Sequence, residues 1–518
     1  MMLNLFSSSI IRVVAGGELH RLTLPQTLAT LMRDEVESFP GLRPHQRHAW
    51  HMFLAQLGAI ALHRAQRSEA PQDAEDWADL LPALTGGAQE PWSLVVADLS
   101  KPAFLQPPVP EKSLSALKNA IPTPDALDVL IAAKNFDVKA AVAAAAEPDE
   151  WLFALVSLQT MEGFLGAGNY GIARMNGGFS ARPFLGLAPM KGGPGAHLRR
   201  DILAMLALRR RQPDIYELYD DEGLALLWLE PWDGKASLPL SRLDPWFIEI
   251  CRRVRFVPQG DGFIVRSVGT AAARIDAKAL NGVTGDFWAP VNDAEGKAFS
   301  LDARGFSYRV LCRLLFIEAG ARHFRLPPAM EAQPGEADML VTARGIARGQ
   351  GKTEGFHERI VPMRSGTVRA LASAERRQTL GQIADRQQKE IAQIFAALRF
   401  ACAVVATGAS EKPGKDAYAH GDPFTRRLEA EAEAGFFDTL QDRDERGDDA
   451  KAPYLRHLID YAEQLLAEAA ESIPCRSRHR WRVRVRAPGA FYGALWSGKG
   501  ALANDRDLVF PQKETADA

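Results

Sequence analysis

The chain has 518 residues, 47% of them hydrophobic and 24% charged, and a formal net charge of −2 at pH 7. This composition is ordinary for a soluble globular protein, and the length predicts two or more domains. The net charge does not favour nucleic-acid binding by the surface as a whole, so such a function would have to rest on local basic segments. No run of about 18 apolar residues and no signal-peptide pattern occurs, which predicts a cytoplasmic protein without a membrane partner.

Short strands and one long helix are expected first along the chain. Residues 3–30 favour strands and turns, with a hairpin at Gly16 and Gly17. Residues 43–65 are apolar along most of their length, which predicts a mostly buried helix. Residues 102–124 carry many prolines and predict loop and extended chain.

A glycine-rich segment separates this region from a mixed one. A helix is expected in the alanine-rich residues 138–160, whereas residues 163–195 hold ten glycines and cannot be regular throughout. From about residue 200 to residue 370, strand-like runs alternate with helices, which is an α+β pattern. We therefore predict an N-terminal α/β domain over residues 1–370.

The pattern changes to helices after residue 370. Ser373 can cap a long helix whose apolar residues recur at a spacing of three to four. Further helices are expected at 424–440 and 453–472, with a short one at 489–496. Four helices with connecting loops predict a C-terminal four-helix bundle over residues 371–518, and thus an α+β fold for the whole chain.

The cysteines and one group of histidines could suggest metal sites, but neither pattern is strong evidence for one. The four cysteines (Cys251, Cys312, Cys402 and Cys475) have no partner within four residues, so we expect reduced and mostly buried thiols, without a disulfide framework or a zinc ribbon. His45, His48 and His51 follow H-x-x-H-x-x-H on one broad helix face, but no carboxylate is nearby in sequence to orient the imidazoles. We expect ordinary histidines and no bound metal.

Two glycine motifs resemble nucleotide-binding loops. Residues 166–171 fit G-x-G-x-x-G, but a helix is expected before them, and no acidic residue follows between Glu162 and Asp201. Residues 349–353, GQGKT, resemble the end of a P-loop, although the first glycine that a P-loop requires falls at Ile346. A P-loop-like enzyme that binds a nucleotide remains the alternative from another class.

The same glycine segments are suited to nucleic acid. Backbone without a Cβ can approach a groove closely, and Asn or Gln side chains can bond to base edges in a minor groove. Basic residues close to both segments would contact phosphates: Arg174 and Arg182 near the first, and Arg344, Arg348, Lys352 and Arg359 near the second. Residues 475–486 add six arginines around Trp481. The alternative is that all three are surface segments with solvated charges.

Several segments of the chain resemble those of a known protein family. Residues 159–183 and 343–359 resemble segments of the large subunit of the type I-E CRISPR surveillance complex Cascade, the CasA family. LNLF near the start, KPAFLQ at 101–106, AKNFD at 133–137 and the helical C-terminal part follow in that family's order. The resemblance covers essentially the whole chain.

The resemblance implies a DNA-binding protein that is not an enzyme and needs no cofactor. Its partners would be CRISPR RNA, double-stranded target DNA, the other Cascade subunits and a helicase–nuclease. It would recognise the protospacer-adjacent motif, start strand separation and R-loop formation, and help to recruit the helicase–nuclease in antiviral defence. A purely structural scaffold subunit is a further alternative. Some members carry a cysteine cluster in the middle of the chain, but here Cys251 stands alone, so no zinc is expected.

The resemblance also assigns roles to residues. The motif contacts would be Gly166, Gly168, Asn169 and Gln350, with Lys278 or Arg274 as the basic contact. Gln350 would act as a wedge in the duplex, in a loop with Gly349 and Gly351, while Arg344, Arg348 and Lys352 hold the nucleic-acid backbone. Lys134, Asn135 and Phe136 would lie near the RNA handle.

Overall fold

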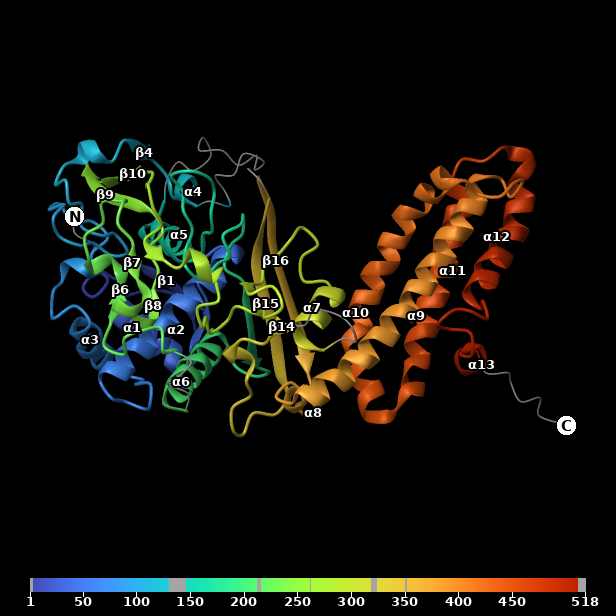
Figure 1. Ribbon diagram of the computed structural model, residues 1–518, viewed down its shortest axis with the longest axis horizontal. Helices are drawn as coiled ribbons and strands as arrows, with labels where there is room; N and C mark the ends of the chain where they lie inside the picture. The colour runs from blue at the N-terminus through green and yellow to red at the C-terminus, as the bar shows by residue number, and fades with distance from the viewer. Residues whose placement is uncertain are drawn as a thin grey trace. The chain divides into compact units, whose positions relative to one another are not determined.

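The computed structural model describes residues 3–128, 130, 146–211, 216–260, 262–317, 324–349 and 352–510 (Figure 1). Lys134, Asn135, Phe136, Gln350 and Gly351, which the sequence assigned to nucleic-acid contacts, lie outside these residues. The chain divides into two compact units. Unit 1 is Met1–Phe306 with Phe324–Ser365, and unit 2 is Ser307–His323 with Gly366–Ala518.

Unit 1 combines helices with several small sheets. Its helices are α1 (Leu24–Met32), α2 (Arg47–Arg64), α3 (Ala74–Ala83), α4 (Pro124–Leu127), α5 (Pro148–Met161) and α6 (Pro194–Arg211). Its strands are β1 (Ile11–Ala15), β2 (Glu18–Leu22), β3 (Val36–Ser38), β4 (Asn119–Ile121), β5 (Phe184–Pro189), β6 (Leu224–Leu226), β7 (Leu238–Pro239), β8 (Leu243–Ile248), β9 (Arg253–Gln259), β10 (Gly262–Val268), β11 (Ile275–Asp276), β12 (Val291–Asn292), β13 (Lys297–Ala298), β14 (Phe324–Arg325), β15 (Met339–Gly349) and β16 (Lys352–Met363).

The core of unit 1 is built around α2. This helix is apolar on every side, so it is stable only when neighbours cover it all round. It packs against α3, α5, α6 and β8, and an aromatic cluster of Trp50, Phe53 and Phe153 fills the space beside it. The expected buried helix over 43–65 is thus confirmed, as is the hairpin at Gly16 and Gly17, which joins β1 to β2.

The sheets of unit 1 are mostly antiparallel. β15 and β16 form a long ribbon that pairs with β5 on one side, in the order β16-β15-β5 (Figure 1). A second sheet has the order β4-β10-β9. Residues 343–349 and 352–359, part of a basic glycine-containing segment in the sequence, belong to β15 and β16. These two strands pair from Met339↔Met363 to Gly349↔Lys352, with a register shift between Ala347 and Arg348.

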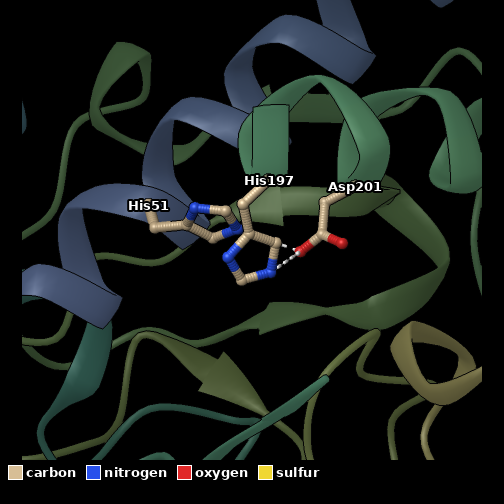
Figure 2. Close-up of side chains that lie close together, drawn as sticks. All are labelled: His51, His197 and Asp201. Carbon is tan, nitrogen blue, oxygen red and sulfur yellow. Dashed lines mark hydrogen bonds and ion pairs between the residues drawn. The ribbon is translucent and has the colours of Figure 1, made fainter. Parts of the chain in front are cut away.

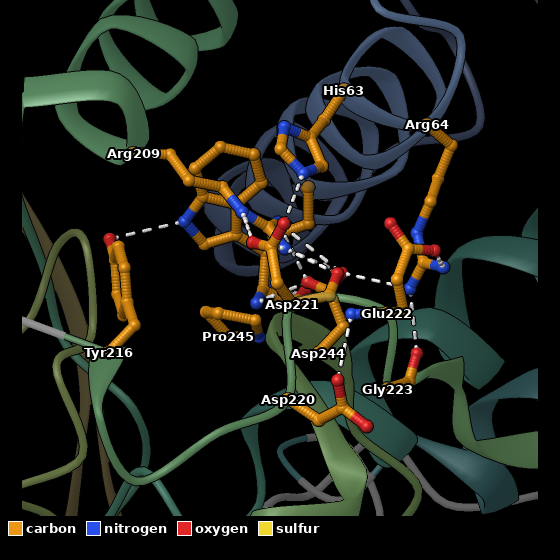
Figure 3. A network of polar contacts seen from close by, with 12 residues as sticks. His63, Arg64, Arg209, Tyr216, Asp220, Asp221, Glu222, Gly223, Asp244 and Pro245 are labelled. Atoms are coloured by element: carbon orange, nitrogen blue, oxygen red, sulfur yellow. Dashed lines mark hydrogen bonds and ion pairs between the residues drawn. The ribbon is translucent and has the colours of Figure 1, made fainter. Parts of the chain in front are cut away.

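A buried polar network joins the ends of α2, α6 and β8 (Figure 3). Arg209 donates to both carboxylate oxygens of the buried Asp244 at 3.2 and 3.3 Å, and Arg64 donates to the same carboxylate at 3.3 Å. At its exposed edge, His63 lies 3.2 Å from Asp221. The network satisfies charges that would be costly to bury alone.

His48 on α2 is a fully buried imidazole. It stacks on Phe356 with 5.9 Å between the ring centroids, and neither ring nitrogen has a hydrogen-bond partner among the described residues. Burial lowers the pKa of His48 well below the usual value, and the positive charge of Arg344 acts in the same direction. The folded protein therefore holds His48 neutral, whereas the unfolded chain protonates it below a pH of about 6.5.

We expect acid to destabilise unit 1 through His48. Its contribution is fully present above the unfolded pKa and is lost as the pH falls below it, with a limiting slope of about 1.4 kcal/mol per pH unit. His48→Phe keeps the ring but removes the proton, so it should reduce the stability lost between pH 7.5 and pH 5.5 by about 1 kcal/mol. Urea unfolding at both pH values measures this.

Unit 2 is helical. It contains α7 (Tyr308–Leu315), α9 (Ala374–Ala406), α10 (Asp422–Arg446), α11 (Ala452–Ser472), α12 (Arg480–Leu495) and α13 (Arg506–Val509), while α8 (Ser365–Ala370) precedes α9. The side chain of Ser373 accepts from the backbone N–H of Arg376 and caps α9, as predicted. Buried Glu390 on α9 binds Arg443 on α10 at 2.7 Å and Lys451 beside α11 at 3.0 Å. These contacts fix the packing of the bundle.

The α+β prediction with a C-terminal four-helix bundle is confirmed by α9 to α12. Two details differ. α7 packs against α9 and α10, with Tyr308 stacked on Phe436, so this segment belongs to unit 2 although the sequence placed it before residue 370. α12 begins at Arg480 and continues through Pro488, so the fourth helix is longer than expected. Within the described residues, no helix is both long and apolar enough to cross a membrane.

Candidate nucleic-acid interface

The first glycine segment forms a closed loop, which we call the glycine loop (residues 162–181). It leaves the end of α5, and Glu162 and Ala181 form an isolated antiparallel bridge at its base. A Cβ on Gly163 would lie 2.0 Å from the carbonyl oxygen of Ser180, and one on Gly171 would lie 2.5 Å from the carbonyl carbon of Gly163. Only glycine permits this close packing of backbone on backbone.

The tip of the glycine loop is a tight turn over Gly166–Asn169. The backbone N–H of Asn169 donates to the carbonyl of Gly166 at 3.0 Å. Gly166 has φ +113° and Gly168 has φ +84°, values that side chains rarely allow. A Cβ at Gly166 would meet nothing within 4 Å, and Asn169 is exposed. The turn therefore presents backbone and an amide side chain outward.

Residues far away in sequence hold the glycine loop in place. Arg252 is buried and its guanidinium bonds to the carbonyl oxygens of Tyr170 and, at 3.3 Å, Gly163. The backbone N–H of Thr270 donates to the carbonyl of Gly168 at 2.9 Å. No sequence pattern indicates Arg252 or Thr270, because each contacts residues about 80 to 100 positions away along the chain.

A cavity of about 300 Å³ lies beside the glycine loop. Its lining includes Tyr170, Asn176 and Gly177 from the loop and Lys278 from the segment after β11. Lys278 is exposed. Of the two basic candidates, Lys278 thus stands next to the loop with an accessible side chain.

The other candidate, Arg274, is buried. It donates to the backbone carbonyls of Leu227, Glu230 and Pro231 at 3.0 to 3.3 Å. Burial lowers the pKa of Arg274 to about 10. These bonds hold its side chain inside the protein, so of the two basic candidates it is Lys278 that is accessible from solvent.

The β15–β16 hairpin is anchored to the base of the glycine loop. Arg348 donates to both carboxylate oxygens of Glu162 at 2.6 Å and to the hydroxyl of Thr353 at 2.7 Å, and both charged side chains are almost fully buried. Burial raises the pKa of the Glu162 carboxyl, while the charges of Arg348 and Arg252 act against this. The expected phosphate contact by Arg348 does not agree with this burial.

The remaining basic residues near the two segments are either held in ion pairs within the protein or accessible to solvent. Arg344 bonds to Glu358 across the hairpin at 2.5 Å, and only 16% of its side chain is exposed. Lys352 is 58% exposed and pairs with Glu354. Arg174 and Arg182 are buried, with Asp286 2.6 Å from Arg182, so they stabilise the core and are not placed for phosphates.

The segment GQGKT is not a P-loop. A P-loop joins a strand to a helix whose N-terminus faces the phosphates. Here Gly349 ends one strand and Lys352 begins an antiparallel partner of that strand, with direct pairing between the two residues. The alternative of a P-loop enzyme therefore loses the feature on which it rested.

The arginine-rich segment of unit 2 forms the first turns of α12 and the residues before it. Trp481 is 67% and Val485 69% exposed. Arg484 pairs with Glu471 on α11 at 2.8 Å, and Arg486 donates to the carbonyl of Ala409. Cys251, Cys312 and Cys402 are buried, as predicted, and Cys475 is half-buried.

Solved structures match almost the whole chain. Thermus thermophilus CasA (Cse1) has a TM-score of 0.60 over 95% of this chain and 99% of that chain, at 17% sequence identity. Thermobifida fusca Cse1 has a TM-score of 0.64 over 96% and 98%, at 16% identity. The CRISPR-associated protein Cse1 from Acidimicrobium ferrooxidans has a TM-score of 0.60 over 96% and 98%, at 15% identity.

The chain has the CasA fold. No protein-family model and no curated protein matches the sequence. The match covers residues of both units, so the fold that the sequence resemblance implied is confirmed. The sequence identity is too low to transfer the roles of individual residues from those structures to this chain. Those roles depend on the geometry of the glycine loop, Lys278 and the hairpin.

Proposed function

We propose that this chain is the non-catalytic large subunit of a type I-E CRISPR RNA-guided complex, Cascade. In that role it recognises the protospacer-adjacent motif in double-stranded DNA, starts strand separation and R-loop formation, and helps to recruit the helicase–nuclease. Residues 134–136 are proposed to lie near the RNA handle. The solved structures with the same fold carry the names CasA and Cse1, which supports the proposal.

The convergence of three segments carries the proposal. The glycine loop joins two segments that are distant in sequence: it lines one cavity together with Lys278, and Glu162 at its base forms a buried ion pair with Arg348, close to the turn of the β15–β16 hairpin. The turn at Gly166–Asn169 offers backbone and an amide to a groove, and Lys278 and Lys352 offer positive charge. Together they have the chemistry of a motif-reading surface.

Strand separation would begin at the end of the hairpin. Gly349 and Lys352 are the last paired residues, and Gln350 and Gly351 connect them. A side chain that enters the base stack unstacks a step at a cost of a few kcal/mol, which new protein contacts offset. Pairing with the guide RNA then reads the sequence, in a nearly balanced exchange.

The test is binding of the assembled complex to a protospacer library. Type I-E subunits and guide RNA would be assembled with and without this chain, and incubated with duplexes that carry the guide-matched protospacer beside randomised flanking bases. We expect the chain to enrich a restricted set of flanks. Equal recovery of all flanks with the chain present would instead indicate a scaffold subunit, and failure to join the complex would reject the proposal altogether.

Within this function, Gly166→Ala and Gly168→Ala should each weaken binding to motif-bearing duplex roughly tenfold, because holding an alanine at the positive φ that the turn requires costs about 1–2 kcal/mol. Complex assembly, followed by size-exclusion chromatography, should be unchanged. Gly489→Ala is the control, since Gly489 on α12 of unit 2 has no positive φ and open space around it. Equal losses for all three variants, or equal losses on non-motif DNA, would contradict motif reading by the turn.

A further inference from the structure

Two histidines and an aspartate meet inside unit 1, away from the glycine loop. His51 comes from α2, and His197 and Asp201 come from successive turns of α6 (Figure 2). The Nε2 atom of His51 lies 2.9 Å and that of His197 3.7 Å from the same carboxylate oxygen, Oδ2 of Asp201. The three potential ligand atoms all lie within 4.8 Å of one another.

One of these atoms is unsatisfied. The Nε2 atom of His197 is buried and has no hydrogen-bond partner among the described residues, although the imidazole is directed at the carboxylate (Figure 2). His197 as a whole is only 9% exposed. Buried polar atoms in folded proteins almost always have a partner, so an orphan that points into a cluster of ligand-type atoms indicates a missing group.

We propose that His51, His197 and Asp201 bind a divalent transition-metal ion of the Zn²⁺ type. In a tetrahedral zinc site with bonds of about 2.0–2.1 Å, neighbouring ligand atoms are about 3.3 Å apart. The observed separations of 2.9 and 3.7 Å from Asp201 Oδ2 fall on either side of that value. A small shift of each ring would therefore place all three atoms around one ion, with water as the fourth ligand.

The surroundings of Asp201 fit a metal ligand. Trp288 donates its indole N–H to Oδ2 at 2.8 Å, and Arg200 donates to Oδ1 at 3.1 Å, so both oxygens are held in place while Oδ2 keeps a lone pair for the ion. Such second-sphere donors orient metal-binding carboxylates. Arg200 is balanced by Glu336 at 2.9 Å, so its charge is not left unpaired beside the ion.

The ion would fasten α2 to α6. Phe184 of β5 packs edge-on against both imidazoles, with centroids 5.6 Å from His51 and 5.8 Å from His197. Side-chain exposures of 11% for both histidines leave a narrow access for the ion and its water. The site changes the expectation of no metal, which rested on the lack of a carboxylate near His51 in sequence.

Only one of the three H-x-x-H-x-x-H histidines takes part. His45 bonds to Asp128 at 2.7 Å, and His48 is stacked on Phe356. The three histidines of the motif thus lie in three separate environments. The carboxylate that contacts His51 belongs to Asp201, 150 residues further along the chain.

Metal binding by the full chain tests the proposal. The protein would be purified without a histidine tag, stripped with a chelator, and titrated with ZnCl₂ by calorimetry. We expect one tight equivalent, and a rise in Tm of at least about 3 °C at a hundredfold excess over Kd. Co²⁺ in place of Zn²⁺ should show the visible absorption of a four-coordinate ion.

Variants assign the equivalent to this cluster. His197→Gln and His51→Gln should weaken its affinity by roughly 100-fold or more, and Trp288→Phe by roughly tenfold, because it removes only a second-sphere donor. His63→Gln is the matched control, since His63 also lies on α2 beside one carboxylate, that of Asp221 (Figure 3). This variant should leave the affinity for Zn²⁺ unchanged.

The outcomes separate the alternatives. Absence of a tight equivalent in the wild-type chain overturns the proposal, and so does an equivalent that persists in every folded histidine variant. If one variant fails to fold, the other histidine variant and Trp288→Phe decide. If each histidine variant lowers Tm by the same amount with and without Zn²⁺, the cluster stabilises the protein through hydrogen bonds alone, and the metal site is overturned.

Discussion

Glu162→Gln should destabilise unit 1 by about 3–5 kcal/mol, because it leaves the guanidinium of Arg348 buried without a counter-charge. Arg348 then lacks the partner that holds the turn end of the β15–β16 hairpin against the base of the glycine loop. Denaturant unfolding followed by tryptophan fluorescence reports mainly on this unit, since Trp481 and Trp496 are the only tryptophans of the ten outside it.

Two further variants isolate the ion pair. Replacing both partners, with Glu162→Gln and Arg348→Met together, should recover much of the lost stability, because no unpaired charge then remains. Glu358→Gln removes the partner of Arg344 on the same hairpin, where the pair is more exposed, and should cost about 1 kcal/mol or less. Similar losses for Glu162→Gln and Glu358→Gln would show that burial does not make the first pair special.

The helical part of the fold follows from local pattern. The cap at Ser373, the spacing of apolar residues in α9 and the apolar surface of α2 are all readable along the chain, because a helix bonds to residues three and four positions away. The extension of α12 through Pro488 was missed because proline usually ends a helix, and packing against α9 and α11 offsets that preference.

The candidate interface could be predicted only in part. The glycines of the turn stood out by their density, yet sequence alone did not distinguish Gly163 and Gly171, which allow backbone packing, from Gly166 and Gly168, which need positive φ. Charge was equally ambiguous. Arg348 occurs close to Lys352 in a basic segment, but it is buried against Glu162, a partner 186 residues away in sequence.

Long-range partners explain the rest. Asp201 was absent from every motif, because it becomes a neighbour of His51 only when α6 packs against α2. Arg252, just before β9, and Thr270, just after β10, support the glycine loop in the same way. Contacts of this kind depend on the register and packing of whole elements, which no local pattern of residues contains.

Gln350→Ala should prevent or strongly slow R-loop formation on fully paired target DNA, within the proposed function. A wedge supplies the cost of unstacking the first base step, which is a few kcal/mol, so its loss should slow opening by roughly 100-fold. On a target whose bases beside the motif are mismatched, this cost is already removed, and the variant should open DNA nearly as fast as the wild type. Strand opening would be followed with a fluorescent base next to the motif.

Lys352→Ala is the matched comparison for this wedge. Lys352 begins β16, its side chain is 58% exposed, and a phosphate contact there should contribute equally on both targets. We therefore expect Lys352→Ala to weaken binding on paired and mismatched DNA alike and to make binding less dependent on salt, whereas Gln350→Ala affects mainly the paired target. If Gln350→Ala instead reduces opening equally on both targets, the glutamine contributes to binding or folding, because a wedge is needed only where base pairs must be separated.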